Sequence, residues 1–526
     1  MRTLHRRKHA VVRAVGGRLA VPGVGGIHRR RTSAVALPVQ RKAQSRPGHV
    51  QADGAHDRLR FRPTHQGRAA AYHGRWECVL HRPGRVRRVR GSGQDSQRAS
   101  LRVTRAPRST GTTEESERDM AGNGTVRVGV VGCGVVATAY YLPFLMDYEK
   151  ADLVAVCDLR EGRAEACQRL FGARERYADY YDMIDKADID AVFVLTAPGT
   201  HVPFTLAAAE AGKHVLIQKP MATDMRGARA VADAIRAAGV KAVVEPSSST
   251  ALDPEYALLR DLVKNGVLGD VLWFSLASTG PTTYGPGLSS NPYGQDAFYA
   301  ADSGGFLFDL PYAPTQIVSV LGACKSVSAQ AKITRADHKI VPEEEYDKFL
   351  SHATDPRNAN YWDVVVDLPR TQPVKMEAVD NAYSLYEMAD GAQGACHVGR
   401  IFHPVLPGTG GGSLQIYGTE GNLLFGAGYM ASIISTRTEL LPEVEDDGWF
   451  HIRPRGDGSK AKWPQPTPGA FNYYHESSRH LIECILEDRE PIVNVDWGLH
   501  ITEMMAGAIE SSATGRRYDM TTTLDV

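Results

Sequence analysis

The sequence has no long apolar run and no paired cysteines. No stretch approaches the ~18–20 consecutive apolar residues that a membrane-spanning helix requires, so we expect no membrane-spanning segment. The 7 cysteines are scattered, and no two of them form a C-x-x-C pair. The histidines show no metal-ligand spacing either, so the sequence predicts no metal site and a reduced, cytoplasmic setting.

The first 119 residues contain few lysines and few acids. They hold 27 basic residues, of which only Lys8 and Lys42 are lysine, and 8 acidic residues, the first of which is Asp53. The other 407 residues hold 34 basic and 52 acidic residues, so the net charge of +1 conceals two segments of opposite charge. Residues 1–119 also lack a sustained helical or strand period, and we predict that they are a disordered, arginine-rich extension.

Four explanations of this extension compete. Arginine clusters at 29–31 and 85–90 would suit a nucleic-acid-binding tail, and the shortage of acids would suit a transit peptide. Arg6-Arg7 would suit a twin-arginine export signal, although further arginines interrupt the apolar stretch that should follow. We favour a translation start at Met120 and an over-extended gene model, because arginine in place of lysine is typical of GC-rich DNA read in an unused frame.

A glycine-rich turn follows an apolar run that begins at Val126. The run reads as a strand, and the turn and the residues after it read as the start of a helix, which is where a βαβ unit holds a dinucleotide. Gly132 permits the sharp turn, Gly134 lets the backbone approach a pyrophosphate, and Ala137 keeps the helix close to the strand. The residues expected to contact the cofactor here are Gly132, Gly134, Val135, Val136 and Ala137.

An acid at the end of the next apolar run supports this interpretation. Asp158 closes the run 151–158 and lies 26 positions after Gly132, where a carboxylate is expected to bind the adenosine ribose hydroxyls. A carboxylate repels a 2′-phosphate, so Asp158 favours NAD. Arg160 would pair with such a phosphate or stack on adenine, so NADP stays open.

The pattern of expected helices and strands in the rest of the chain changes near Pro246. Before it, short apolar runs alternate with helical stretches, which predicts a doubly wound parallel sheet, a Rossmann domain at 120–246. After it, alternating strands separated by long loops predict an α+β domain at 247–526 with an open, mostly antiparallel sheet. The expected strands are 191–196, 214–217, 241–245, 271–277, 374–379 and 414–417, and the expected helices are 200–212, 224–238, 252–266, 310–321, 472–487 and 496–514.

Lys219 is the first candidate catalytic residue. It lies in Gln218-Lys219-Pro220, directly after the expected strand 214–217. Ligands of open α/β sheets bind outside the carboxyl ends of the strands, so the ammonium would reach the reacting oxygen of a substrate. The alternative is a surface lysine that happens to follow a strand.

Asp309 and Tyr312 are the second candidate group. The Gly304-Gly305 pair before them would let a helix start close against a bulky group, and a spacing of three places both side chains on one helical face as a proton-transfer pair. The alternative is a helix-start cap and a core aromatic. Four aromatic residues upstream would line a sugar site or simply lie on the surface: Tyr284, Tyr293, Phe298 and Tyr299.

Together these motifs resemble the Gfo/Idh/MocA oxidoreductases, the family of glucose–fructose oxidoreductase and inositol dehydrogenase. The resemblance runs from Val126 to the end, about three quarters of the chain. It rests on the glycine turn, Asp158, Thr196-Ala-Pro-Gly-Thr-His201, the block 211–220, Gly304-Gly305-x-x-x-Asp309 and Gly418-Thr-Glu-Gly421. It implies a Rossmann domain, a substrate domain with an open sheet, and cofactor contacts from Thr196, Ala197, Pro198, His201, Gln218 and Lys219. His201 also has a purely structural interpretation.

The chain departs from the family pattern at two positions. The usual Glu-Lys-Pro is here Gln218-Lys219-Pro220, and the His or Tyr expected four residues after the Asp is replaced by Ala313. A turn one residue shorter would give that role to Tyr312, and we assign proton transfer to it.

The resemblance implies an NAD(P)-dependent oxidoreductase that transfers hydride to or from a sugar, polyol or related cyclic compound. Lys219 would orient the reacting oxygen, Tyr312 would exchange the proton, and Asp309 would position them. Two alternatives stay open: a non-catalytic NAD(P)-binding regulator, and a glycoside-cleaving enzyme that recycles bound NAD. We further expect a homo-oligomer formed through the C-terminal sheet, no membrane, and no nucleic acid unless residues 1–119 are part of the protein.

Overall fold

The computed structural model describes residues 124–247, 250–281, 297, 299–358, 368–402, 413–426, 429–452 and 473–525. The interpretations of residues 1–119 and Met120, and the roles offered for Tyr284, Tyr293 and Phe298, lie outside the described residues. None of the described helices is long and apolar enough to cross a membrane.

The first sheet is parallel and has six strands in the order β3-β2-β1-β4-β5-β6. This is the strand order of a Rossmann fold, as predicted. Five strands expected from apolar runs are present, with ends within two residues of those predicted. The strands are β1 (Val126–Val131), β2 (Ala151–Cys157), β3 (Glu175–Tyr177), β4 (Ala191–Val194), β5 (His214–Ile217) and β6 (Ala242–Val244).

Helices cover both faces of this sheet, which explains its continuous apolar strands. Alternate residues of β1 divide between two cores: Val128 and Val130 face one, and Val131 faces the other. Asp224 accepts a hydrogen bond from Gly227 N at 2.7 Å and so caps α6. The helices are η1 (Ala137–Tyr141, a π-helical turn), α2 (Leu142–Asp147), α3 (Glu161–Phe171), α4 (Tyr180–Lys186), α5 (Pro198–Glu210) and α6 (Met225–Ala238).

The second sheet has nine strands in the order β16-β15-β14-β13-β7-β12-β11-β8-β17. Among the described residues its pairs are antiparallel except β12 with β7, which confirms the open, mostly antiparallel sheet. The strands are β7 (Val271–Pro281), β8 (Cys324–Lys332), β11 (Asn381–Met388), β12 (Gln393–Phe402), β13 (Ser413–Gly418), β14 (Gly421–Gly426), β15 (Tyr429–Ser435), β16 (Phe450–Ile452) and β17 (Tyr518–Asp519).

The strand predicted at 374–379 is not part of this sheet. Instead, β10 (Gln372–Lys375) pairs with β9 (Asp337–Ile340) in a separate two-stranded ribbon. Tyr299 is fully buried in the small apolar cluster beside that ribbon, with Ile340 and Met376. Neither interpretation offered for Tyr299, sugar contact or surface tyrosine, is therefore correct, because its ring is needed to fill this cluster.

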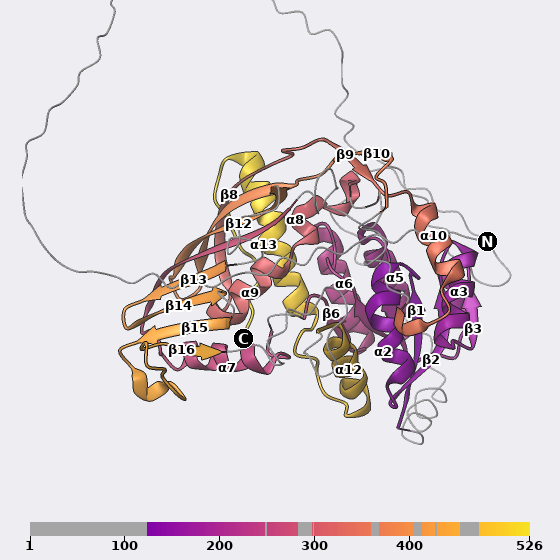
Figure 1. The fold of residues 1–526 in the computed structure, drawn as a ribbon, viewed down its shortest axis with the longest axis horizontal. Helices are drawn as coiled ribbons and strands as arrows, with labels where there is room; N and C mark the ends of the chain where they lie inside the picture. Colours follow the sequence, from indigo (N-terminus) through magenta and orange to yellow (C-terminus); the bar gives the residue numbers. More distant parts are fainter. Residues whose placement is uncertain are drawn as a thin grey trace, which may run out of the picture. The chain divides into compact units, whose positions relative to one another are not determined.

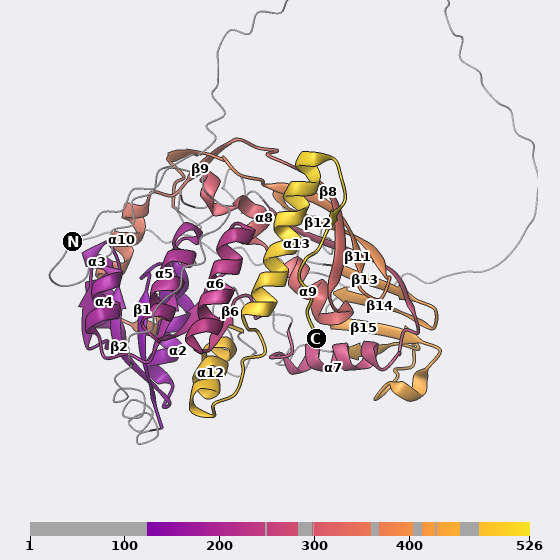
Figure 2. The same ribbon diagram turned by 180° about the vertical axis from the view of Figure 1, so that it is seen from behind.

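One face of the nine-stranded sheet is covered by helices, and these connect it to the first sheet. In Figure 1, α13 lies between the orange strands and the indigo half, and Figure 2 shows it from behind against α6 and β8. Leu259, Ile317 and Met504 fill the core between this sheet and its helices. The helices of this part of the chain are η3 (Ala301–Ser303), α8 (Gly305–Asp309), α7 (Pro254–Lys264), α9 (Tyr312–Leu321), η5 (Thr438–Leu440) and α13 (Val495–Thr514), of which α8, α9 and α13 contact the sheet.

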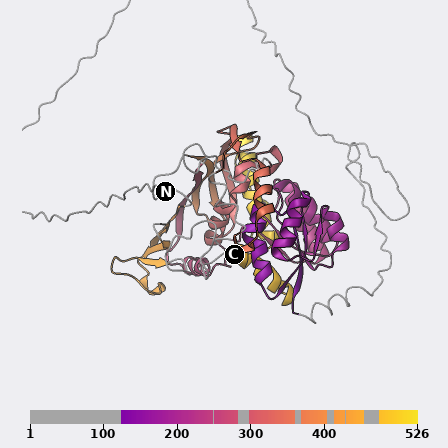
Figure 3. The same cartoon turned by 45° about the vertical axis from the view of Figure 1, so that its right-hand side comes forward.

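Two helices from beyond residue 340 complete the core of the first sheet. The helix α12 (Tyr473–Leu486) packs against η1, β5 and β6, and α10 (Glu343–His352) packs against α3. Leu481 and Ile482 of α12 share an apolar core with Val128 of β1. In Figure 3, the yellow end of the chain again lies against the indigo half. A short helix, η4 (Pro356–Asn358), follows α10.

Candidate active site

The glycine turn is held between the ends of β2 and β4. Gly132 has φ +95°, and a Cβ atom there would lie 2.7 Å from the carbonyl oxygen of Leu195. Its N–H donates to the Cys157 carbonyl at 2.8 Å. Only glycine satisfies both the left-handed backbone and the close approach, so the sharp turn predicted at this position is present.

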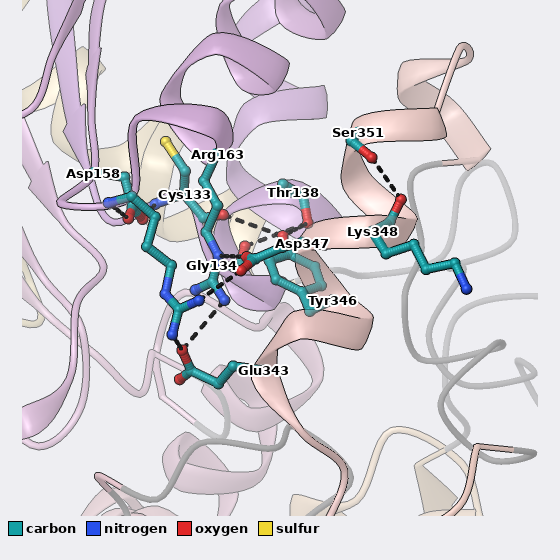
Figure 4. Close-up of polar contacts among 11 residues, drawn as sticks. Cys133, Gly134, Thr138, Asp158, Arg163, Glu343, Tyr346, Asp347, Lys348 and Ser351 are labelled. Carbon is teal, nitrogen blue, oxygen red and sulfur yellow. Dashed lines mark hydrogen bonds and ion pairs between the residues drawn. The ribbon is translucent and has the colours of Figure 1, made fainter.

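Asp158 braces the same turn. Its carboxylate accepts a hydrogen bond from Cys133 N at 2.8 Å and another from Arg160 N at 2.9 Å. Figure 4 shows Asp158 directed at the turn beside Cys133 and Gly134. The acid therefore lies at the end of β2 next to the glycine turn, which is where the ribose of a dinucleotide is bound in this fold.

A cavity of about 450 Å³ opens at the carboxyl ends of these strands. Its size is within the range of ligand sites, and its wall includes the glycine turn and the N-terminal residues of the helix after it, whose N–H groups suit a pyrophosphate. The observed geometry therefore fits a dinucleotide. Of the residues expected to bind the cofactor, ten line the cavity: Gly132, Gly134, Val135, Val136, Asp158, Arg160, Thr196, Ala197, Gln218 and Lys219.

Three expected cofactor residues, Ala137, Pro198 and His201, are not among those lining the cavity. Ala137 is buried at the start of η1, and Pro198 is the first residue of α5. His201 is fully buried, and its ring nitrogens lie 2.7 Å from the Pro220 carbonyl and 2.9 Å from the Thr196 carbonyl. Burial lowers the pKa of this histidine. His201 thus connects the loops after β4 and β5, which favours the structural interpretation.

The cavity also has wall residues that the sequence did not single out. Leu159, Tyr181 and Phe204 supply apolar and aromatic surface, and Arg163 and Glu343 supply charge. Leu159 and Arg163 lie within five residues of Asp158 in the sequence, and this closeness to the expected ribose-binding acid could have identified them as cavity residues. Glu343 had no such signal, because it lies 185 positions after Asp158.

Lys219 lines the cavity and contacts Asp309, which, like Tyr312, is not among the residues lining it. The Lys219 ammonium forms an ion pair with the Asp309 carboxylate and donates to the Asp309 carbonyl at 3.2 Å. Both side chains are largely shielded, with 14% and 11% of their surface exposed. The ring centroid of Tyr312 lies 5.9 Å from the same ammonium nitrogen. The fold therefore brings together the three residues assigned to catalysis.

Asp309 and Tyr312 do not share a helical face, contrary to the prediction. Asp309 is the last residue of α8, whereas Tyr312 is the first residue of α9. Pro311 separates them: it lacks an N–H and disfavours a helical conformation at Leu310, which has φ −118° and ψ 50°. The two side chains converge on Lys219 through a break between helices.

The glycine pair before Asp309 acts as expected. Gly304 and Gly305 have φ +73° and +68°. A Cβ at Gly305 would lie 2.3 Å from the Val379 carbonyl oxygen, and one at Gly304 would lie 2.6 Å from the ring of Phe308. The pair therefore lets α8 begin in close contact with a neighbouring backbone and its own aromatic ring.

A buried hydrogen-bond chain begins at Gln218. Its amide nitrogen donates to the Tyr141 hydroxyl at 2.9 Å, and that hydroxyl donates to Glu245 Oε1 at 3.0 Å. Glu245 also accepts from Ser247 N at 2.7 Å and from the Ser477 hydroxyl. Burial raises the pKa of Glu245, and these hydrogen bonds oppose that effect. Glu245 was not predicted from the sequence, although an acid that directly follows a buried strand was the available signal.

This fold and cavity define a class: a Rossmann-type dinucleotide-binding protein with a second half built on an open sheet. Two family models identify it further. One, described as an oxidoreductase family with an NAD-binding Rossmann fold, matches residues 126–245, and the GFO/IDH/MocA C-terminal domain matches residues 256–424. The chain belongs to the Gfo/Idh/MocA oxidoreductase family, as its motifs predicted.

Curated relatives match part of the chain. An inositol 2-dehydrogenase of Klebsiella pneumoniae (strain 342) is 32% identical over 154 residues, which cover 29% of this chain and 45% of that protein. A dTDP-3,4-didehydro-2,6-dideoxy-alpha-D-glucose 3-reductase of Streptomyces violaceoruber is 30% identical over 198 residues, which cover 37% and 54%. The chain thus spans about half the length of the curated relatives it matches.

Solved structures share the fold over a longer stretch. Levoglucosan dehydrogenase in its apo form has a TM-score of 0.59 at 19% identity, with 76% of this chain and 100% of that chain covered. An aldose-aldose oxidoreductase from Caulobacter crescentus has a TM-score of 0.53 at 21% identity, with 75% and 100% covered. These likenesses confirm the predicted fold.

Proposed function

We propose that this protein is an NAD(P)-dependent oxidoreductase that acts on a CH–OH or carbonyl carbon of a sugar, a polyol or a related cyclic compound. The observation that carries the proposal is the Lys219–Asp309 ion pair, with Tyr312 beside it, because Lys219 lines the same cavity as the glycine turn. Relatives named for inositol and for a dideoxy sugar support this substrate class.

When bound, the nicotinamide cofactor supplies the hydride acceptor or donor. The residues that would hold the dinucleotide are the glycine turn for the pyrophosphate, Asp158 for the adenosine ribose, and Thr196 and Ala197 beyond the end of β4. Gln218 and Lys219 would border the reactive end, because they follow β5 and line the same cavity.

Lys219 would orient the reacting oxygen of the substrate. Its ammonium is a hydrogen-bond donor and is fixed in place by the Asp309 carboxylate and carbonyl. A shielded positive charge stabilises negative charge that develops on a carbonyl or alkoxide oxygen far better than an exposed one. Asp309 is a positioning residue in this scheme, since it acts through the lysine.

Tyr312 would exchange the proton of the substrate hydroxyl. Oxidation of a carbinol removes that proton while hydride leaves the carbon, so a proton carrier must stand near the oxygen that Lys219 orients. Tyr312 is the first residue of α9, and its ring centroid lies 5.9 Å from the Lys219 ammonium nitrogen. This position, beside the ammonium, supports the assignment of proton exchange to the Tyr312 phenol.

A substrate panel tests the proposal. Sugars and inositols are incubated with NAD or NADP, and the absorbance of the reduced cofactor is followed. With the substrate found, Lys219→Ala and Tyr312→Phe should each lower kcat roughly 10²- to 10⁴-fold, the usual contribution of a positioned proton-transfer group. Lys186→Ala removes an exposed lysine of α4 and serves as the matched control, with unchanged kcat expected.

Three results would contradict the proposal. Wild-type kcat in both variants would remove Lys219 and Tyr312 from catalysis. Tight NAD binding without turnover on any panel member would favour the non-catalytic regulator, and release of an aglycone without net NADH would favour the glycoside-cleaving alternative.

We also propose that the protein forms a homo-oligomer through the nine-stranded sheet. The register places Trp273, Tyr383, Leu385 and Ile434 on the face opposite the helices. All four side chains are exposed, and Tyr383 and Leu385 expose 57% and 63% of their surface. Trp273 also stacks on Tyr417, with ring centroids 4.6 Å apart, so the patch presents a flat aromatic surface that suits a second copy.

A further inference from the structure

The helix α10 reaches the glycine turn from a distant part of the chain. It follows β9, yet the Tyr346 hydroxyl donates to the Cys133 carbonyl at 3.1 Å and lies 3.1 Å from the Thr138 hydroxyl. Tyr346 and Leu350 are buried in the same core as β1. Figure 4 shows Tyr346 directed from α10 at Cys133 and Thr138. α10 is thereby fixed to the wall of the dinucleotide cavity.

Two acids of α10 bind the two arginines that follow Asp158. Arg160 pairs with Glu343 at 2.5 Å and with Asp347 at 2.6 Å. Arg163 pairs with Asp347 at 2.5 Å and with Glu343 at 3.4 Å. The Arg163 side chain is only 8% exposed and lies over the Tyr346 ring at 4.8 Å, so this part of the cluster is shielded from solvent.

This cluster lies where a 2′-phosphate would have to bind. Asp158, Arg160, Arg163 and Glu343 all line the cavity, at the end of β2 where the adenosine ribose of a dinucleotide is placed. An arginine at this position is the group that accommodates the 2′-phosphate of NADP. In this chain, three carboxylates face two arginines, and both guanidinium groups are already bound by α10.

We propose that α10 sets the cofactor preference: Glu343 and Asp347 occupy Arg160, so that the cavity selects NAD(H) over NADP(H). A 2′-phosphate carries a charge of about −2 at neutral pH and would meet Asp158 and Glu343 while competing with both α10 acids for Arg160. The ribose hydroxyls of NAD are uncharged, so they are not repelled by these carboxylates and do not compete for Arg160. This inference rests on the proposed function and adds a selectivity determinant from the second half of the chain.

The test measures binding, with no turnover required. Isothermal titration calorimetry of the full chain gives Kd values for NAD⁺ and NADP⁺, and for ADP-ribose and its 2′-phosphate, which lack the nicotinamide. The wild type should bind NAD⁺ at least about 100-fold more tightly than NADP⁺, within what removal of a charged contact in a shielded site produces. ADP-ribose and its 2′-phosphate should show the same ratio.

Neutral isosteres of the two acids isolate the effect. Glu343→Gln with Asp347→Asn keeps the side-chain volumes and should tighten NADP⁺ binding at least tenfold, with Kd for NAD⁺ within about threefold of wild type. Adding Arg160→Ala should abolish this gain, because the freed guanidinium would be its cause. Glu344→Gln removes an exposed acid of the same helical turn and is the matched control, with an unchanged ratio.

The outcomes separate this inference from the proposed function. If neither nucleotide binds the wild type, the proposed function fails. If NAD⁺ binds and the NADP⁺-to-NAD⁺ ratio is the same in wild type and the double variant, the role of α10 is refuted. Should the double variant lose its circular-dichroism melting transition, the ratio measured for Glu343→Gln alone decides between the two results, since its pair with Arg160 lies at the cavity wall.

Discussion

Position 218 carries an amide where the family pattern has a carboxylate, and the buried carboxylate beside it belongs to Glu245 instead. The Gln218 amide, next to Lys219, donates a hydrogen bond to the Tyr141 hydroxyl. That hydroxyl in turn donates to the Glu245 carboxylate. The residue type at 218 therefore decides in which direction the Tyr141 hydroxyl donates. With glutamine at 218, the hydroxyl proton points to Glu245, and the amide, the phenol and the carboxylate all have partners.

Gln218→Glu should destabilise the fold. A carboxylate at 218 replaces the donor with a second acceptor, so the single Tyr141 proton would face two buried acids and one of them would lose its partner. We expect a loss of about 1–3 kcal/mol in the free energy of unfolding, measured by urea denaturation.

The exchanged double variant is the control for this prediction. Gln218→Glu with Glu245→Gln restores one acid and one amide around Tyr141, and it should recover at least half of the lost stability. If Gln218→Glu alone is as stable as the wild type, the hydrogen-bond chain does not constrain residue 218.

Among the elements, α13 is connected to β8 through a histidine. His500 accepts a hydrogen bond from Cys324 N at 3.0 Å through Nε2, and its Nδ1 lies 2.8 Å from the Thr522 hydroxyl. Burial lowers the pKa of His500 to about 4, and the nearby Glu503 partly opposes this shift. Only the neutral ring can accept the hydrogen bond from the Cys324 backbone N–H, so the contact between helix and strand depends on pH.

Acid should weaken this contact. The unfolded chain binds a proton at residue 500 below about pH 6.5, whereas the folded chain does so only near pH 4, so stability falls as the pH falls through this window. Between pH 6.5 and 5 the loss attributable to His500 is up to about 2 kcal/mol.

Urea unfolding at pH 7 and pH 5 measures this loss. His500→Gln keeps an acceptor for Cys324 N but does not titrate, so its stability should change less between the two pH values. An equal change in the wild type and the variant would show that the fold does not lower the pKa of His500.

The elements also mark where sequence reasoning succeeds and where it fails. Strands β4 and β5 were predictable because each is a short apolar run buried on both faces. The glycine turn was predictable because its sharp turn requires a positive φ, which glycine adopts readily. Pro311 was a signal for the break, yet the three-residue spacing between Asp309 and Tyr312 suggested a single helix. Residue spacing alone does not reveal a break between two short helices.

Contacts between distant segments were beyond local patterns. Lys219 and Asp309 were each predicted, but their ion pair joins positions 90 residues apart and follows only from the packing of the two sheets. Glu343 had no motif at all, because an acid in the first turn of an acidic helix is ordinary. Its place in the cavity wall comes from Tyr346, which fixes α10 against the turn.

At the scale of the whole molecule, the proposed homo-oligomer depends on the open face of the nine-stranded sheet. Leu385→Lys places a charge within the proposed interface, on the same strand and face as Tyr383, and should shift the protein from oligomer to monomer in size-exclusion chromatography with light scattering. Leu258→Lys changes a leucine of α7, on the other side of the sheet, and should leave the mass unchanged. A wild-type chain that elutes as a monomer at micromolar concentration would contradict the proposed interface.

The shared core of the first sheet has a consequence for how such a chain can be inherited. Leu481, Ile482 and Leu350 lie more than 200 residues beyond Val128, yet they fill the same core as that strand. A gene fragment that stops at Pro246 would carry every strand of the Rossmann sheet and leave part of one face uncovered. Recombination that exchanges substrate-binding halves must therefore carry α10 and α12 with the new half, so cofactor handling and substrate recognition are inherited as a single module.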